Sequence, residues 1–364
     1  MKSMYSYQTS RLIKKFWLLF VIVIIFSASA KFTVYRSFDS SNNLTYMNKE
    51  TAEIYNELIE NSADKTLDQC DEYITEYEMK SYASGYNNNI TAAVNKYKTE
   101  LRSCFMVESI RSYARTGRGL TDANIPTDLV KNSRLYAAFS TPQVINDEPF
   151  LKFLELQAVD IMPIFVLLLV GVFVADSYEK RMDRQIKISK NSAAFFKSRE
   201  IILSAAIFIM FTLSFFADLI LSGTLQQSEY STAPLQSVWE FDLSPVMLTV
   251  RGTIIWLCVT RLMSFFATYS IFVLVAKQVC SVKKYIMLTS GLIAIMSAAA
   301  HYLGTFSPYM FAAVTSVNGQ LNNLDYMRAF DCSEAVAVFI YLAAILSGLT
   351  AWRYSGYYEK SFDR

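Results

Sequence analysis

Six long apolar segments dominate the chain, and each is close to the length that a helix needs to cross a bilayer. About 20 apolar residues in a helix span the hydrocarbon core, and 53% of the sequence is hydrophobic. The segments are 16–35, 157–175, 201–222, 253–276, 285–303 and 335–351. We therefore expect an all-α polytopic membrane protein with six transmembrane helices.

The first segment has a second interpretation, as a cleaved signal peptide. A basic pair at Lys14, an apolar run and the small residues 28–30 fit that pattern. However, the apolar run continues to Tyr35, and its removal would leave an odd number of spans. We expect a retained helix in the N-terminal region 1–35.

Charge predicts the orientation of the helices, because cytoplasmic loops are enriched in Lys and Arg. Residues 1–15 contain four basic residues and no acidic one, whereas 223–250 contains three acidic residues and no basic one. Loop 277–284 is again basic, and 303–334 is again acidic. Both termini should therefore be cytoplasmic. The composition, rich in Lys, Asn and Tyr, is typical of a bacterial protein, which indicates the bacterial cytoplasmic membrane.

This topology divides the chain into three regions. Residues 1–35 form the cytoplasmic N-terminus and first membrane helix, and 36–156 form a helical extracytoplasmic domain. Residues 157–364 form a membrane domain with five further helices. That domain includes a short basic cytoplasmic loop at 176–200 and an external hairpin at 303–334.

Two apolar stripes at helical spacing, 67–77 and 94–104, predict two helices in the extracytoplasmic domain. The midpoint between Cys70 and Cys104, position 87, falls inside the turn-like run 81–89 between these helices. Folding the helices back on each other would place the two sulfurs opposite one another. We expect a disulfide, which is permitted outside the cytoplasm; the alternative is two buried free thiols. Cys332 would then be an odd external thiol.

Charged residues inside the apolar segments are candidate functional residues, since each is costly unless it faces protein or water. Asp218 lies near the outer end of the third segment and Arg261 lies well inside the fourth. Consecutive spans are usually neighbours, so the two residues are expected to form an intramembrane polar pair. This pair is either a structural clamp between helices or part of a polar lining along a translocation path.

Several function classes find no support in the sequence. There is no phosphate-binding loop, no zinc spacing and no basic stripe for nucleic acid. The lone histidine, His301, has no catalytic partners in the same compartment. We therefore expect neither an enzyme nor a metal protein, with no cofactor bound directly and no nucleic-acid partner.

The loop 176–200 carries seven basic and four acidic residues and joins two apolar segments. Apolar residues recur between its charges, which is typical of an amphipathic helix that lies on a membrane or docks on a partner. An equally simple interpretation is a solvated basic loop that only sets topology. The apolar or aromatic residues are Tyr178, Met182, Ile186 and Ile188.

Three features resemble the permease subunit of type-2 ABC transporters, mostly exporters, and in particular Firmicute members. The first is loop 176–200, where Phe173 and the charged run 176–181 precede Ile186-Lys187-Ile188-Ser189 and a return through 197–199. The second is the external segment 233–250, and the third is the hairpin 303–334. The resemblance covers 157–364 and the first span.

The resemblance implies a dimeric permease with a second copy or a homologue. Each half would dock its cytoplasmic loop on a separate ABC ATPase subunit, which supplies ATP and Mg²⁺ chemistry. The implied substrate is amphipathic: a peptide such as an antimicrobial peptide, a lipid or a drug. Membrane lipid would be a further partner. The implied coupling residues are Tyr178, Glu179, Met182, Ile186 and Ile188.

Two other functions remain open from the sequence. The chain could be a membrane sensor or scaffold whose extracytoplasmic domain binds a ligand or protein, although four further spans fit a receptor poorly. It could also be a proton-driven carrier, for which more intramembrane carboxylates and an internal repeat would be expected.

Overall fold

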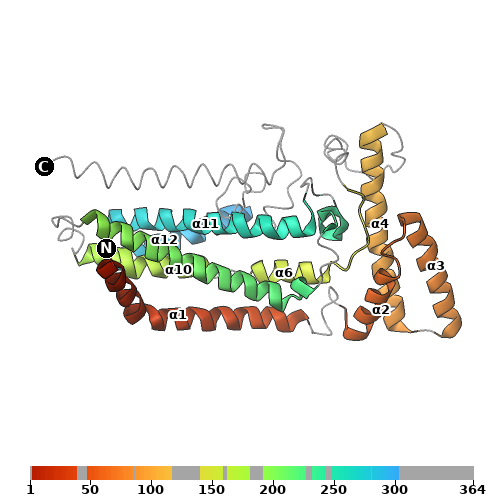
Figure 1. Ribbon diagram of the computed structural model, residues 1–364, viewed down its shortest axis with the longest axis horizontal. Helices are drawn as coiled ribbons and strands as arrows, with labels where there is room; N and C mark the ends of the chain where they lie inside the picture. Colours follow the sequence, from red (N-terminus) through yellow and green to blue (C-terminus); the bar gives the residue numbers. More distant parts are fainter. Residues whose placement is uncertain are drawn as a thin grey trace.

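The computed structural model describes residues 2–38, 47–85, 87–116, 140–158, 162–180, 192–226, 232–242, 244, 248–279 and 281–302. These parts of the chain are helical apart from short connections and one isolated β-bridge. Figure 1 shows the long helices running along the long axis, with three helices gathered at one end and the N-terminus at the other. The prediction of an all-α chain is confirmed for the described residues.

Three helices are long and apolar enough to cross a membrane. The apolar stretches lie at Val21–Phe38, Ala194–Leu221 and Val250–Val279. They belong to helices that begin before the predicted segments, because residues on the N-terminal side continue each helix. The helices are α1 (Lys2–Phe38), α10 (Ser192–Leu221) and α11 (Val250–Val279). At three of the six predicted segments, the described part of the chain thus has a helix that is long and apolar enough to cross a membrane.

The remaining predicted spans differ in outcome. Segment 157–175 includes the end of α6 (Glu148–Ala158) and all of α7 (Met162–Val170), and residues 159–161 between them lie outside the described residues. Segment 285–303 corresponds to α12 (Val282–Tyr302). Segment 335–351 and the hairpin 303–334 lie outside the described residues.

Three helices form a small domain at one end of the bundle, here called the α2–α4 domain (residues 47–116). The helices are α2 (Lys49–Glu60), α3 (Leu67–Ser84) and α4 (Asn88–Thr116). Thr66 and Gln69 form a capping box at the start of α3, which satisfies two backbone donors that the first turn leaves free. The helix ends at Gly85, whose φ of +118° suits glycine. Both helices predicted in this region, at 67–77 and 94–104, are confirmed.

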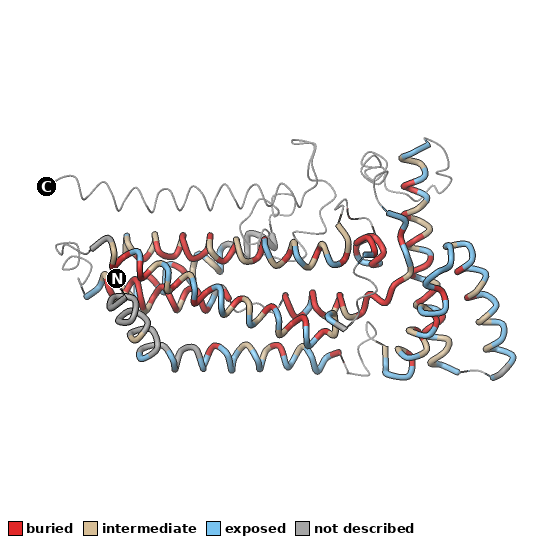
Figure 2. Tube along the Cα trace, viewed as in Figure 1, coloured by how far each residue is buried: buried red, intermediate tan, exposed pale blue. Residues whose placement is uncertain are grey.

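The bundle packs around a continuous apolar core of α6, α7, α10 and α11, which appears as the red inner segments of Figure 2. Aromatic rings interlock between these helices. The ring centroids of Phe153 and Phe215 lie 5.4 Å apart, and those of Phe211 and Phe265 lie 5.6 Å apart. By contrast, α1 runs along one side of the bundle and exposes most of its surface.

A largely buried segment before α11 forms contacts between the bundle and the α2–α4 domain. It contains the short turns η4 (Leu235–Ser237) and η5 (Trp239–Phe241), and it follows η2 (Thr224–Gln226). Ser103 on α4 donates a hydrogen bond to Asp242 at 2.9 Å. The backbone N–H of Gln143 donates to the Ser237 hydroxyl at 3.0 Å. Both hydrogen bonds join segments that are distant in sequence.

A π-helical turn, η1 (Gly171–Ala175), lies between α7 and the short helix α8 (Asp176–Glu179). Tyr285 of α12 packs against this turn and donates a hydrogen bond to the carbonyl of Leu167 at 3.1 Å. A Cβ on Gly171 would lie only 3.0 Å from Cε1 of Tyr285. Glycine at position 171 therefore allows Tyr285 of α12 to approach this turn closely. π-Helical turns are also frequent at functional sites.

We expect Gly171→Ala to destabilise the bundle by about 1–3 kcal/mol, since the added methyl group forces the buried Tyr285 ring to move. The matched control is Gly291→Ala on α12, where nothing lies within 4 Å of the added Cβ. That change should be neutral or stabilise by about 0.5–1 kcal/mol. Thermal unfolding of both variants in detergent measures the difference. Equal unfolding midpoints for Gly171→Ala and wild type would show that the Tyr285 ring leaves room for a methyl group at position 171.

Candidate functional site

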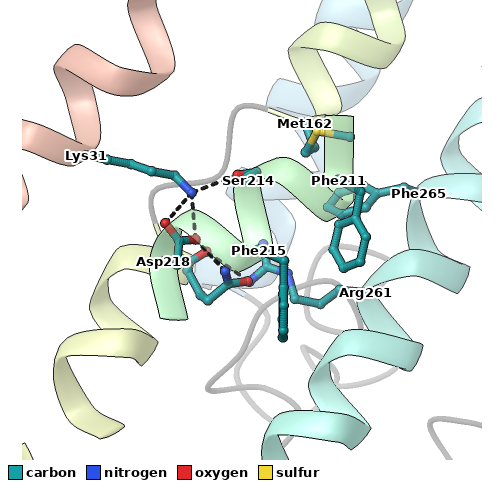
Figure 3. A pocket seen from close by; sticks show the side chains of 9 residues that line it. Lys31, Met162, Phe211, Ser214, Phe215, Asp218, Arg261 and Phe265 are labelled. Atoms are coloured by element: carbon teal, nitrogen blue, oxygen red, sulfur yellow. Dashed lines mark hydrogen bonds and ion pairs between the residues drawn. The ribbon is translucent and has the colours of Figure 1, made fainter. Parts of the chain in front are cut away.

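A buried ion pair joins α1 to α10. The ammonium of Lys31 lies 2.6 Å from each carboxylate oxygen of Asp218. The hydroxyl of Ser214, one helical turn earlier on α10, accepts a further hydrogen bond from Lys31 at 2.7 Å. Lys31 is 6% exposed and Asp218 is fully buried. The dashed lines in Figure 3 mark these contacts.

Gln157, near the end of α6, extends this pair into a network of four helices. Its side-chain amide donates a hydrogen bond to Asp218, and its backbone carbonyl accepts one from Arg261 of α11 at 2.9 Å. Arg261 is buried, and its guanidinium lies 5.9 Å from the centroid of the Phe265 ring. The network therefore contains two cations and one carboxylate inside a largely apolar bundle.

The space around this network is small. Its cavity measures about 10 Å³, which is the space of about one water molecule. Met162 and three phenylalanine rings, from Phe211, Phe215 and Phe265, line the apolar side of the cavity. In this conformation the network can hold helices in register, but it has no room for a ligand.

The predicted pair of Asp218 and Arg261 is part of this network, although the two residues connect through Gln157. The partner that touches Asp218 directly is Lys31, which the sequence analysis did not select. Its signal was present, because a lysine inside the apolar segment 16–35 meets the same criterion that selected Asp218 and Arg261.

Two of the five predicted coupling residues lie in the described part of the chain, and both contact the bundle. Tyr178 is half-buried against the apolar core. The Glu179 carboxylate accepts a hydrogen bond from the backbone N–H of Val282 at 3.2 Å, at the first residue of α12, where a negative charge is favourable. Met182, Ile186 and Ile188 lie outside the described residues.

The predicted disulfide is not formed in the structure, where Cys70 and Cys104 are free, buried thiols. The sulfur of Cys70 lies 3.8 Å from the carbonyl oxygen of Ser62, and Tyr97 of α4 is its neighbour across the helix pair. Cys104 lies two helical turns further along α4 than Tyr97. Cys70 is thus packed beside Tyr97 of α4 and is not bonded to Cys104. Burial raises the pKa of both thiols.

A second buried charged cluster lies where the α2–α4 domain meets α6. Lys96 of α4 lies 3.7 Å from the carboxylate of Glu100 and 3.3 Å from that of Asp147. Tyr55 of α2 donates a hydrogen bond to Glu100. Among the described residues, no group of His, Cys, Asp and Glu is arranged to hold a metal ion.

Burial raises the pKa of the carboxyl groups in this cluster. Desolvation, followed by the nearby charge of Asp147, raises the pKa of Glu100 well above its ordinary value. Desolvation also raises the pKa of Asp147, although the Lys96 ammonium opposes this shift. The pKa of Glu240 is raised by burial and then by the charge of Asp147. Burial at this junction thus raises the pKa of Glu100, Asp147 and Glu240.

We expect Lys31→Met and Asp218→Asn each to cost about 3–5 kcal/mol of stability, because each leaves one buried charge without its partner. The double variant should recover part of that loss, since it removes both charges of the pair and leaves buried Arg261 as the remaining charge of the network. Lys14→Met, an exposed site on the same helix, should stay within about 0.5 kcal/mol of wild type. Thermal unfolding in detergent gives the coupling energy, and strictly additive effects would mean that the two side chains do not interact.

We expect Glu100→Gln to increase stability at neutral and alkaline pH. A carboxyl group with a raised pKa in the folded state favours folding fully below the unfolded pKa, about 4.3 for Glu. This contribution is lost as the pH rises toward the folded value. Wild-type stability should therefore decline with rising pH more steeply than that of the variant.

Thermal midpoints from pH 5 to pH 9 measure this difference. Glu53→Gln, an exposed site on α2, is the matched control and should follow the wild-type curve. Parallel curves for Glu100→Gln and wild type would place the Glu100 pKa at its ordinary value.

Comparison of the chain with protein-family models, curated proteins and solved structures found no match. What the protein does is therefore inferred below from its own residues and contacts.

Proposed function

We propose that this chain is the permease subunit of an ATP-driven ABC exporter. The observation that carries the proposal is the buried charged network of Lys31, Asp218, Gln157 and Arg261, which four helices share within an apolar bundle. The cargo is an amphipathic peptide, lipid or drug. The chain works with a second permease copy or homologue and with a pair of ABC ATPase subunits that bind ATP and Mg²⁺.

Energetics support a transport role for this network. A buried ion pair is costly to desolvate and often contributes less stability than apolar residues of the same volume. Ionisable groups among membrane helices are therefore commonly found along substrate pathways. Separation of α1 from α10 would expose Lys31 and Asp218 beside apolar helix faces, a combination that suits an amphipathic cargo.

Contacts at the opposite end of the bundle offer a route for force from a partner ATPase. The segment beginning at Asp176 continues directly from the π-helical turn η1, and its Glu179 contacts the start of α12. Tyr285 of α12 in turn contacts the carbonyl of Leu167 on α7. Movement of loop 176–200 would therefore act on α7 and α12 together. The charge alternation of the loops supports a cytoplasmic location for this end and for both termini.

A membrane sensor is the second candidate function. Hydrogen bonds between the α2–α4 domain and segments that lead into the bundle favour it. Ser103 on α4 contacts Asp242 in the connection before α11. Asn56 on α2 accepts a hydrogen bond from Asn146, which precedes α6, at 2.7 Å. A ligand that moved α2 or α4 would thus act on two segments that lead into the bundle.

Copurification tests the exporter proposal. We expect the chain, expressed in its native host and isolated in mild detergent, to bring down an ATP-hydrolysing subunit in stoichiometric amount. Ile186→Asp should abolish this association, because a charge replaces an apolar contact in the coupling loop, and Ile186→Leu is the matched control that should retain it. Isolation of a complex without any ATPase, or equal ATPase recovery with both variants, would contradict the proposal.

A further inference from the structure

An apolar cavity of about 300 Å³ is lined mainly by residues of α1 and α10. Its lining includes small residues on both helices: Ser27 and Ala28 on α1, and Ser214 and Ala217 on α10. Small side chains fill less of the space beside the two helices than large ones would. Its volume is about twice that of the ~150 Å³ apolar cavity that takes up one benzene in another protein.

The cavity opens onto the outer surface of the bundle. Phe32 of α1 and Leu213 of α10 line it and are also 57% and 61% exposed. Both helices are long and apolar enough to span a membrane. In a bilayer, this opening therefore faces lipid chains, and an empty apolar space there would forfeit the dispersion contacts of its lining.

A cation lies beside the cavity near the end of α1. The guanidinium of Arg36 lies 5.5 Å from the centroid of the Phe32 ring, and Tyr35 also lines the cavity. Arg36 is exposed and stands in the last turn of the apolar stretch Val21–Phe38, where a membrane helix reaches the headgroup layer. Guanidinium groups bind phosphate with paired, charge-assisted hydrogen bonds.

Lys31 also touches the cavity, but it is not available for a headgroup. Both carboxylate oxygens of Asp218 and the Ser214 hydroxyl already hold its ammonium. The site therefore combines an apolar interior with one accessible cation, Arg36, beside its mouth.

We propose that this cavity binds one acyl chain of a membrane phospholipid whose phosphate is held by Arg36. The apolar lining and the opening toward the bilayer select the chain, and the guanidinium selects an anionic phosphate. The bound chain would lie against both α1 and α10, beside the Lys31–Asp218 pair that joins them. This proposal does not depend on the exporter function.

Photo-crosslinking tests the location of the lipid. The photoreactive residue p-benzoylphenylalanine is placed at Leu213 in the full chain, which is reconstituted in nanodiscs of phosphatidylglycerol and phosphatidylcholine, irradiated and analysed by mass spectrometry. We expect a phospholipid adduct at Leu213 that is at least fivefold more abundant than at Phe216, an exposed α10 position outside the cavity. Equal adducts would indicate only surface lipid. An adduct to a peptide would mean that protein covers the opening, and either result would overturn the proposal.

Retained phospholipid gives an independent measurement. After extensive washing in mild detergent, wild type should keep about one phospholipid per chain, measured as phosphorus and by native mass spectrometry. Ala217→Phe, which fills the cavity, should lose it, whereas Ile209→Phe on the exposed face of α10 should retain it. Absence of bound phospholipid in wild type, or equal retention by Ala217→Phe and Ile209→Phe, would overturn the proposal.

The Arg36→Gln variant distinguishes the contribution of the phosphate to lipid binding from that of the acyl chain. We expect it to weaken binding of spin-labelled phosphatidylglycerol by about tenfold, the loss of one charge-assisted contact. Binding of a spin-labelled diacylglycerol, which has no phosphate, should be unchanged. An equal effect on both lipids, or none on phosphatidylglycerol, would show that Arg36 does not bind the phosphate.

Discussion

The ion pair between Lys31 and Asp218 is the interaction that fixes α1 in this protein. Only 17% of the apolar stretch of α1 is buried, against 56% for that of α11, so apolar packing restrains α1 weakly. A buried pair restrains it strongly, because the attraction between charges grows as the dielectric constant falls. Sliding α1 by one turn, about 5.4 Å, would separate the ammonium from both carboxylate oxygens. The pair therefore specifies the register of α1 against α10.

Helix α6 connects the two buried charged clusters. Its first residue, Glu148, lies beside Asp147 at the junction with the α2–α4 domain, and Gln157 near its other end bonds to Asp218. Nine residues of helix separate these positions, a rise of about 14 Å. The helix therefore places one cluster at each of its ends.

Local patterns made much of the fold predictable. Apolar runs of bilayer length indicated α1, α10, α11 and α12, and helical periodicity indicated α3 and α4. Within segment 157–175, the apolar run did not predict the π-helical turn that begins at Gly171. Hydropathy averaged over 20 residues does not register such a turn. The charged residues Asp218 and Arg261 were also recognisable, since each stands alone in an apolar surrounding.

The sequence by itself determined which segments are helical, which are apolar enough for a membrane, and which charges need partners. Only the tertiary structure decided the partners. Asp218 pairs with Lys31 and reaches Arg261 through Gln157, and Cys70 lies beside Tyr97 while Cys104 lies two turns away. The reason is geometric: each residue along a helix rotates the side chain by about 100° and advances it by about 1.5 Å. Contacts between helices therefore depend on register and tilt, which packing of the whole chain sets.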